Sequence, residues 1–132
     1  MTIHPMIAVR DVPASADFYG RLLGAVSGHG GDEYEQLLVN GRLVLQLHDC
    51  RADPHHGPLR DLAVQPGNGL LLWFITDDFE AQLERAQAMG LQPSRAPAQN
   101  PFSGSMEFWC LDPDGYQIVI AGPSTHGKQR PD

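Results

Sequence analysis

Apolar and polar positions along the chain form two successive stretches with the same order of elements. The first predicts a strand over residues 3–10 and then an amphipathic helix near 14–23. The second predicts a strand over the apolar run 70–76 and then a helix near 78–89. Each helical stretch runs from an Asp to a Gly 13 positions later. Two stretches that match in both type and length indicate an internal repeat.

The strands after each helix repeat as well. In chain order they are predicted just after residue 24, at 34–39, 42–49, 91–95, 105–111 and 116–121. Asn40-Gly41 joins the two long strands of the first half, and this dipeptide is typical of a two-residue hairpin. The turn at 112–115, with the sequence Asp-Pro-Asp-Gly, joins those of the second half. Each half therefore has the order β-α-β-β-β.

The repeat predicts an α+β fold made of two βαβββ modules with mixed sheets. The modules cover residues 1–50 and 68–122, and a polar linker over 51–67 connects them within one domain, 1–122. Residues 123–132 are expected to form a polar tail. Because one helix covers only one face of each sheet, the opposite faces are expected to curl around a shared cavity.

Composition excludes several classes of function. The 9 Lys and Arg residues against 16 Asp and Glu give a formal charge of −7, which argues against a nucleic-acid partner. Such acidity suits neutral or cationic small molecules, although solubility alone also explains it. No apolar run reaches the roughly 18–20 residues of a membrane span, and no signal peptide is recognisable, so a cytoplasmic protein is expected. Cys50 and Cys110 are expected to be reduced and buried.

Several motifs within this repeat resemble a known superfamily. They are His4 to Asp11, Phe18-Tyr19, Leu23-Gly24 and Asp112-Pro113-Asp114-Gly115-Tyr116. Together they resemble the vicinal oxygen chelate superfamily, which contains glyoxalases, bleomycin resistance proteins and extradiol dioxygenases. The resemblance covers residues 3–121 and implies the glyoxalase/bleomycin resistance fold. It does not identify the activity, because this fold hosts unrelated chemistries.

The resemblance also implies four positions for a divalent metal. They fall on His4, Gln46, Leu71 (or Leu70 if the register slips by one) and Val119. Leu and Val have no lone pair to donate, and a catalytic site needs at least three protein ligands, so no metal and no other cofactor is expected. If a metal were present, its ligands would be His4, Gln46 and Glu107. His48 is the further candidate.

Strand parity selects the side chains that would line the cavity. Gln46 and His48 share one face of their strand, as do Glu107 and Trp109 on theirs. The resemblance places the Glu107 side and His4 inward. These inward residues have two possible interpretations, a rearranged His/His/Glu metal site and a hydrogen-bonded polar cluster. The polar cluster is favoured. The candidate ligand-binding residues are His4, Gln46, His48, Trp73, Phe102, Glu107 and Trp109.

Three candidates keep alternative interpretations. Trp73 is either part of the core against the helix or part of the cavity wall. Phe102 either closes over a ligand or packs within its own loop. The pair His55-His56, in a loop flanked by Pro and Gly, either caps the cavity mouth or is solvated.

Two classes of function follow from these candidates. The first is a metal-independent protein that binds a small molecule, in which Trp109, Trp73 and Phe102 stack on a planar ligand and Glu107 favours a cationic one. The resemblance to bleomycin resistance proteins implies a homodimer. The second class is an enzyme. It would be a metal-dependent lyase, thiol transferase or dioxygenase with a non-standard ligand set, or a metal-free catalyst in which Glu107 or His48 moves a proton.

Overall fold

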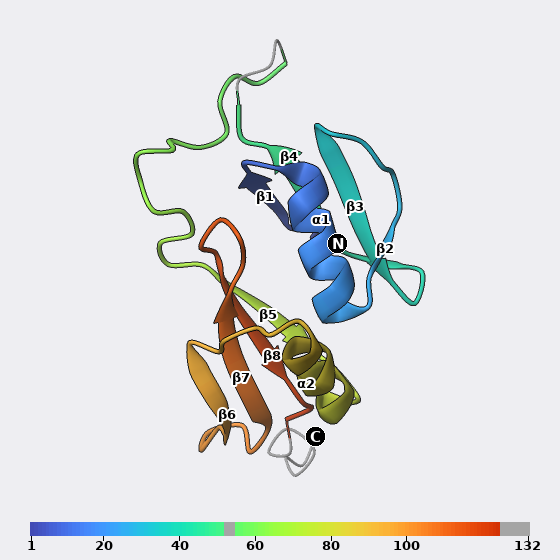
Figure 1. Ribbon diagram of the computed structural model, residues 1–132, viewed down its shortest axis with the longest axis vertical. Coiled ribbons are helices and arrows are strands. Elements are labelled where there is room, and N and C mark those ends of the chain that lie inside the picture. The colour runs from blue at the N-terminus through green and yellow to red at the C-terminus, as the bar shows by residue number, and fades with distance from the viewer. Residues whose placement is uncertain (52–54, 125–132) are drawn as a thin grey trace. The chain divides into compact units, whose positions relative to one another are not determined.

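A computed structural model describes residues 1–51 and 55–124 (Figure 1). The chain divides into two compact units, Met1–Pro66 and Gly67–Asp132, and each is described by itself. Most of the predicted polar tail, from residue 125 onward, lies outside the described residues. Within the described residues, no helix has both the length and the apolar character needed to cross a membrane.

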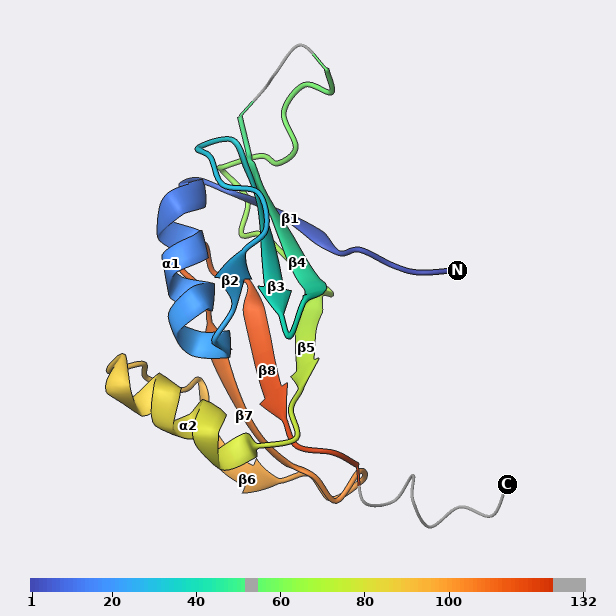
Figure 2. The ribbon, with the colours of Figure 1, turned by 90° about the vertical axis from the view of Figure 1, so that its right-hand side faces the viewer.

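The first unit is a four-stranded mixed sheet with one helix across one face (Figure 2). Its elements are β1 (Met6–Val9), α1 (Val12–Leu23), β2 (Val26–Ser27), β3 (Tyr34–Val39) and β4 (Arg42–Asp49). The strand order is β1-β4-β3-β2, in which β1 runs parallel to β4 and the other neighbours are antiparallel. Side chains of Tyr19, Leu22, Leu37, Leu45 and Leu47 are fully buried in its core.

Local sequence explains where the elements of the first unit begin and end. The Asp11 side chain accepts a hydrogen bond of 3.0 Å from the Ala14 N–H and caps the start of α1. Gly24, at φ 70°, ends the helix in the left-handed conformation. Asn40 and Gly41 have φ values of 51° and 75°, as a tight hairpin turn requires, so the predicted β3–β4 hairpin is confirmed.

The second unit repeats this architecture. Its elements are β5 (Leu71–Ile75), α2 (Phe79–Ala88), β6 (Arg95–Gln99), β7 (Met106–Leu111) and β8 (Gln117–Ala121). The order is β5-β8-β7-β6, with β5 parallel to β8. The rings of Phe79 and Phe108 meet edge to face at 5.9 Å and join α2 to the sheet. The two βαβββ modules predicted from the repeat are therefore present.

The predicted strand at 91–95 is wrong, because β6 covers Arg95–Gln99 instead. The Leu91 N–H donates to the Ala86 carbonyl and so still belongs to the end of α2, and Pro93 has no N–H to give a strand. Pairing with β7 starts only where the Ser94 N–H donates to the Trp109 carbonyl.

Two other predicted boundaries also differ from the structure. The first strand begins at Met6, so His4 precedes it and is exposed. The N-cap of α2 is Asp78 rather than Asp77, because the Asp78 side chain accepts the Ala81 N–H at 3.1 Å. Measured from N-cap to C-cap, α1 spans 13 positions from Asp11 to Gly24 and α2 spans 11 positions from Asp78 to Met89, so the two stretches differ by two residues.

Candidate functional site

A row of four side chains crosses the sheet of the second unit. Trp73 on β5 pairs with Val119 on β8, Val119 pairs with Trp109 on β7, and Trp109 pairs with Arg95 on β6. Residues in register on neighbouring strands share a face of the sheet. This face is the one opposite α2, since Phe108, the neighbour of Trp109 in the chain, contacts the helix. We call Trp73, Val119, Trp109 and Arg95 the aromatic row.

The indole of Trp109 is fixed on three sides. Its Nε1–H donates to Glu107 Oε1 at 3.3 Å, and its ring meets that of Trp73 edge to face at 6.5 Å. The Arg95 guanidinium lies over the ring, 4.1 Å from the centroid. A ligand ring can therefore stack on this face of Trp109 only if Arg95 moves aside.

Glu107 is linked to the loop that carries Phe102. The Asn100 amide donates to Glu107 Oε2 at 3.1 Å, while its own oxygen accepts the N–H groups of Phe102 and Ser103. Both donors to the carboxylate are neutral groups, the Trp109 indole and the Asn100 amide. Phe102 itself is 86% exposed and so is not buried within its loop. Trp73 is 42% exposed and is not part of the core against α2.

Arg95 and Asn100 were missed by sequence reasoning. Arg95 stood at the end of the strand wrongly predicted at 91–95, so its partner across the sheet was not identifiable. Asn100 precedes a proline in a predicted loop, where a turn residue needs no functional explanation. The register of β6 on β7 reveals Arg95, and the hydrogen bond to Glu107 reveals Asn100.

A chain of hydrogen bonds crosses the sheet of the first unit. The Gln36 amide donates to the Tyr34 hydroxyl at 3.1 Å, and that hydroxyl donates to Gln46 Oε1 at 2.5 Å. The Gln46 amide in turn donates to the His4 carbonyl at 3.1 Å. Gln46 is thus committed to protein partners through both ends of its amide, and His4 joins the chain through its backbone. Tyr34 and Gln36 were not among the predicted site residues.

His48 lies on the same face of β4 as Gln46, as parity predicted. Its backbone is paired on both sides, with Ala8 on β1 and Tyr34 on β3. Its Nε2 is 3.3 Å from Nε2 of His56. The loop histidine His56 is exposed, yet it contacts a strand residue rather than standing apart in solvent.

The seven predicted ligand-binding residues divide between the two units. Three lie in the first unit, namely His4, Gln46 and His48; four lie in the second, namely Trp73, Phe102, Glu107 and Trp109. Their convergence in one cavity stays a prediction. In the part of the chain that the structure describes, no group of three or more His, Cys, Asp or Glu residues is placed to hold a metal ion.

Glu35 is a buried carboxylate that sequence reasoning did not single out. Burial raises its pKa, but hydrogen bonds from the N–H groups of Gly30, Gln36 and His29 and from the Ser27 hydroxyl outweigh this, so the pKa is lowered overall. Glu35 is therefore an ionised anchor for the segment after β2, and it is unsuited to donating a proton.

Two further titratable groups have pKa values that their surroundings explain. Hydrogen bonds from the Arg51 guanidinium lower the pKa of Asp49 to about 2. Burial raises the pKa of the Cys110 thiol to about 12, and the charge of Asp112 adds to this. Cys50 and Cys110 are both free and buried, as predicted. None of these groups lies on the aromatic row.

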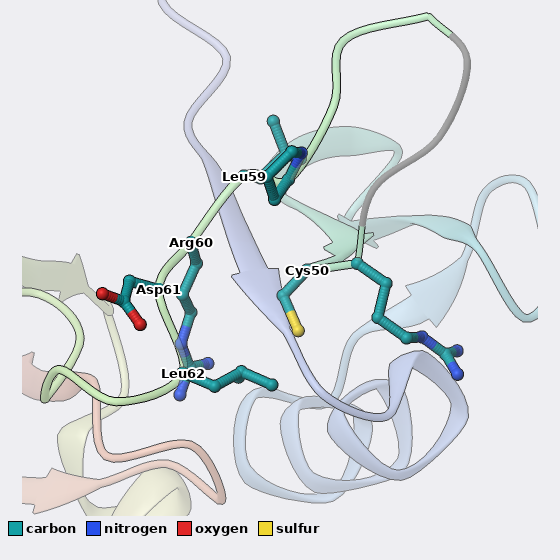
Figure 3. A pocket seen from close by; sticks show the side chains of 7 residues that line it. Cys50, Leu59, Arg60, Asp61 and Leu62 are labelled. Carbon is teal, nitrogen blue, oxygen red and sulfur yellow. The ribbon is translucent and has the colours of Figure 1, made fainter.

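A separate pocket of about 680 Å³ lies in the first unit (Figure 3). It is lined by Cys50, Arg51, Pro58, Leu59, Arg60, Asp61 and Leu62. The Leu59 N–H donates to the Cys50 carbonyl, and the Arg60 guanidinium donates to the Ala8 carbonyl at 3.1 Å. In Figure 3 the Leu62 side chain extends toward the Cys50 sulfur. The pocket is thus a space between the connecting segment and β4, and it was not predicted.

Comparison with known proteins decides the family. A sequence model described as the Glyoxalase/Bleomycin resistance protein/Dioxygenase superfamily matches residues 2–120. The chain belongs to this superfamily. No curated protein matches the sequence.

Solved structures of the same fold confirm the architecture. A lactoylglutathione lyase from Agrobacterium tumefaciens is 19% identical with a TM-score of 0.72, covering 96% of both chains. A bleomycin-binding protein complexed with bleomycin is 19% identical with a TM-score of 0.67, covering 92% of this chain and 98% of that one. A bleomycin resistance determinant encoded on transposon Tn5 is 18% identical with a TM-score of 0.69, covering 93% and 98%. At these identities the likeness shows the fold.

The metal site expected of the superfamily's enzymes does not fit the residues present. Leu71 and Val119 offer no lone pair, and Val119 is fully buried within the aromatic row. The Gln46 amide oxygen accepts the Tyr34 hydroxyl. Two of the four positions thus lack a donor, and a third uses its donor within the protein, so these four positions do not make a complete metal site.

Proposed function

We propose that this superfamily member binds a small planar molecule on the aromatic row, without a complete superfamily metal site. One observation carries the proposal: Val119, at the position where the resemblance puts a metal-binding Glu, pairs with Trp73 on one side and Trp109 on the other. The position expected to bind metal is apolar and has an indole on either side. Such a surface favours stacking and disfavours a charged ion.

The row also has the polar groups that a ligand site needs for orientation. Ligand sites combine apolar and aromatic surface with a few placed polar groups. Here these are the Glu107 carboxylate, held by Trp109 and Asn100, and the Arg95 guanidinium. A cationic planar group would replace Arg95 on the Trp109 ring and gain the nearby carboxylate. Stacking of this kind contributes about 0.5–1.5 kcal/mol per ring beyond the buried area.

The remaining parts of the proposal concern the first unit and the assembly. In the first unit, His4, Gln46 and His48 are the candidate ligand-binding residues, and in the second unit Phe102 would close over the ligand. A homodimer in the cytoplasm, with no nucleic-acid partner, is the expected setting. The printed name of the bleomycin-binding protein supports a small-molecule role, and the two free buried thiols are consistent with a reducing compartment.

Tryptophan fluorescence tests the proposal directly, because the chain has two tryptophans and both are in the row. The probes are proflavine, a planar cation, and acridone, a neutral planar ring system. We expect saturable quenching by proflavine that weakens when Glu107 is replaced by Gln. The matched control Val26→Ala removes exposed apolar surface from β2 and should leave the affinity unchanged.

Either of two outcomes would contradict the proposal. If neither probe quenches saturably, or if Glu107→Gln and Val26→Ala change the proflavine affinity equally, the aromatic row is not the binding site. Circular dichroism of each variant shows whether it is folded before its affinity is interpreted.

A further inference from the structure

The Arg95 side chain covers one face of the Trp109 indole. Its guanidinium carbon lies 4.1 Å from the ring centroid, which is within the range of a cation–π contact. The two residues are in register on β6 and β7, so the contact is made directly across this strand pair. A cationic group of the chain itself therefore occupies the proposed stacking surface.

The hydrogen bonds of the neighbouring carboxylate go to other groups. Glu107 Oε1 accepts the Trp109 indole N–H, and Glu107 Oε2 accepts the Asn100 amide. Each carboxylate oxygen thus has a neutral donor, and the Arg95 guanidinium lies on the ring instead. An exposed cation–π contact is weak compared with the burial of a whole aromatic ring, so a planar ligand can displace the guanidinium.

The strand that carries Arg95 allows this displacement. All five residues of β6, Arg95–Gln99, are exposed, and β6 is an edge strand of the sheet. Its pairing with β7 is irregular between Arg95 and Ala98, and Pro97 in this stretch has no N–H to donate. The Arg95 side chain can therefore leave the ring by rotating into solvent, without any change to the buried core.

Displacement of Arg95 affects neutral and cationic ligands differently. A neutral ring replaces only the contact between the guanidinium and Trp109. A cationic ring replaces the same contact and then lies beside the displaced guanidinium, whose charge has the same sign. Glu107 attracts a cation while Arg95 repels it, so the two side chains act on the charge preference of the row in opposite directions.

We propose that Arg95 is the specificity-determining residue of the aromatic row. Its guanidinium covers Trp109 until a planar ligand displaces it, and it then disfavours cationic rings relative to neutral ones. This inference rests on the proposed function, and it names the side chain by which the row distinguishes planar ligands of different charge.

Fluorescence titrations of Arg95→Ala with acridone and proflavine at about 0.15 M salt test this role. We expect the Kd for acridone to fall by about two- to fivefold, which corresponds to the loss of an exposed cation–π contact of about 0.5–1 kcal/mol. The Kd for proflavine should fall by a further factor of about two, because a like charge is also removed.

Arg85→Ala is the matched control for this change of charge. It removes a guanidinium from an exposed position on α2, and this helix covers the opposite face of the same sheet. Since salt screens a charge on the far face, Arg85→Ala should change either Kd by less than about twofold.

Acrylamide quenching measures the cover over Trp109 without any planar ligand. The Trp73→Phe background leaves Trp109 as the one tryptophan of the chain. In this background we expect Arg95→Ala to raise the Stern–Volmer constant, because the indole loses the group that lies over it. Arg85→Ala should leave the constant unchanged.

Three results would overturn the inference. If Arg95→Ala lowers the Kd of acridone and of proflavine by the same factor, or lowers neither, Arg95 does not set the charge selectivity. Equal effects of Arg95→Ala and Arg85→Ala would assign the change to net charge alone. An unchanged Stern–Volmer constant would show that Arg95 does not cover Trp109.

Failure of the proposed function gives a different pattern. Neither probe would then quench the wild type or Arg95→Ala saturably, and the selectivity role would fall with the site. The acrylamide measurement would still decide whether Arg95 covers Trp109, because it needs no planar ligand.

Discussion

Replacing Trp109 by Leu tests whether the aromatic row is a coupled unit. Leu keeps part of the apolar contact but removes three interactions of the indole. The contact with the Arg95 guanidinium contributes about 0.5–1 kcal/mol, the edge-to-face contact with Trp73 about 0.5–1.5, and the long hydrogen bond to Glu107 about 0.5–1. We expect the free energy of unfolding to fall by about 2–3 kcal/mol.

Urea unfolding followed by far-UV circular dichroism measures this change without relying on the lost indole. Arg95→Gln removes the guanidinium alone and should cost about 0.5–1 kcal/mol. Trp73→Leu removes the edge-to-face contact and some apolar area. Its loss in free energy of unfolding should lie between those of Arg95→Gln and Trp109→Leu. The double variant of Arg95 and Trp109 should cost less than the sum of the singles, because both remove the same contact. If Trp109→Leu costs no more than Arg95→Gln, the three interactions do not stabilise the fold as described.

Three further outcomes are expected. Asn100→Ala removes one donor to Glu107 and should lower the free energy of unfolding by about 1 kcal/mol in urea; an unchanged midpoint would contradict the hydrogen bond. The folded-state pKa of Asp49, about 2 against an ordinary 3.8, implies stability that is complete above pH 3.8 and is lost as pH falls through 2. Because Arg51 is exposed, this amounts to about 1 kcal/mol, and acid titration of Asp49→Asn should show a flatter loss than the wild type. The Cys110 thiol, with its pKa raised to about 12, should react with iodoacetamide only after unfolding in urea, and rapid labelling of Cys110 in the native protein would contradict its burial.

Much of the fold could be predicted because local chemistry specifies it. The Asn40-Gly41 turn fixes one hairpin, and Asp11 and Gly24 mark the ends of α1. Parity along β4 and β7 also held, since a strand side chain alternates whether or not its partners are known. These features depend on residues close together in the chain.

The partners of the site residues could not be predicted in the same way. Arg95 reaches Trp109 only through the register of an edge strand that contains Pro97, where the pairing is irregular. Tyr34 reaches Gln46 across two antiparallel strands, and His56 reaches His48 from a turn. Such contacts are set by tertiary packing, which a single sequence does not encode at short range.

The central claim is that a planar ligand binds the aromatic row without a metal. Two-dimensional NMR of the two indole N–H groups, recorded during titration with proflavine in the presence of EDTA, tests it most directly. The chain has only Trp73 and Trp109 as tryptophans, so the spectrum reports the row alone. We expect the Trp73 and Trp109 signals to shift together to saturation, unaffected by EDTA. Proflavine binding that leaves both signals in place, or shifts that vanish with EDTA, would contradict the account.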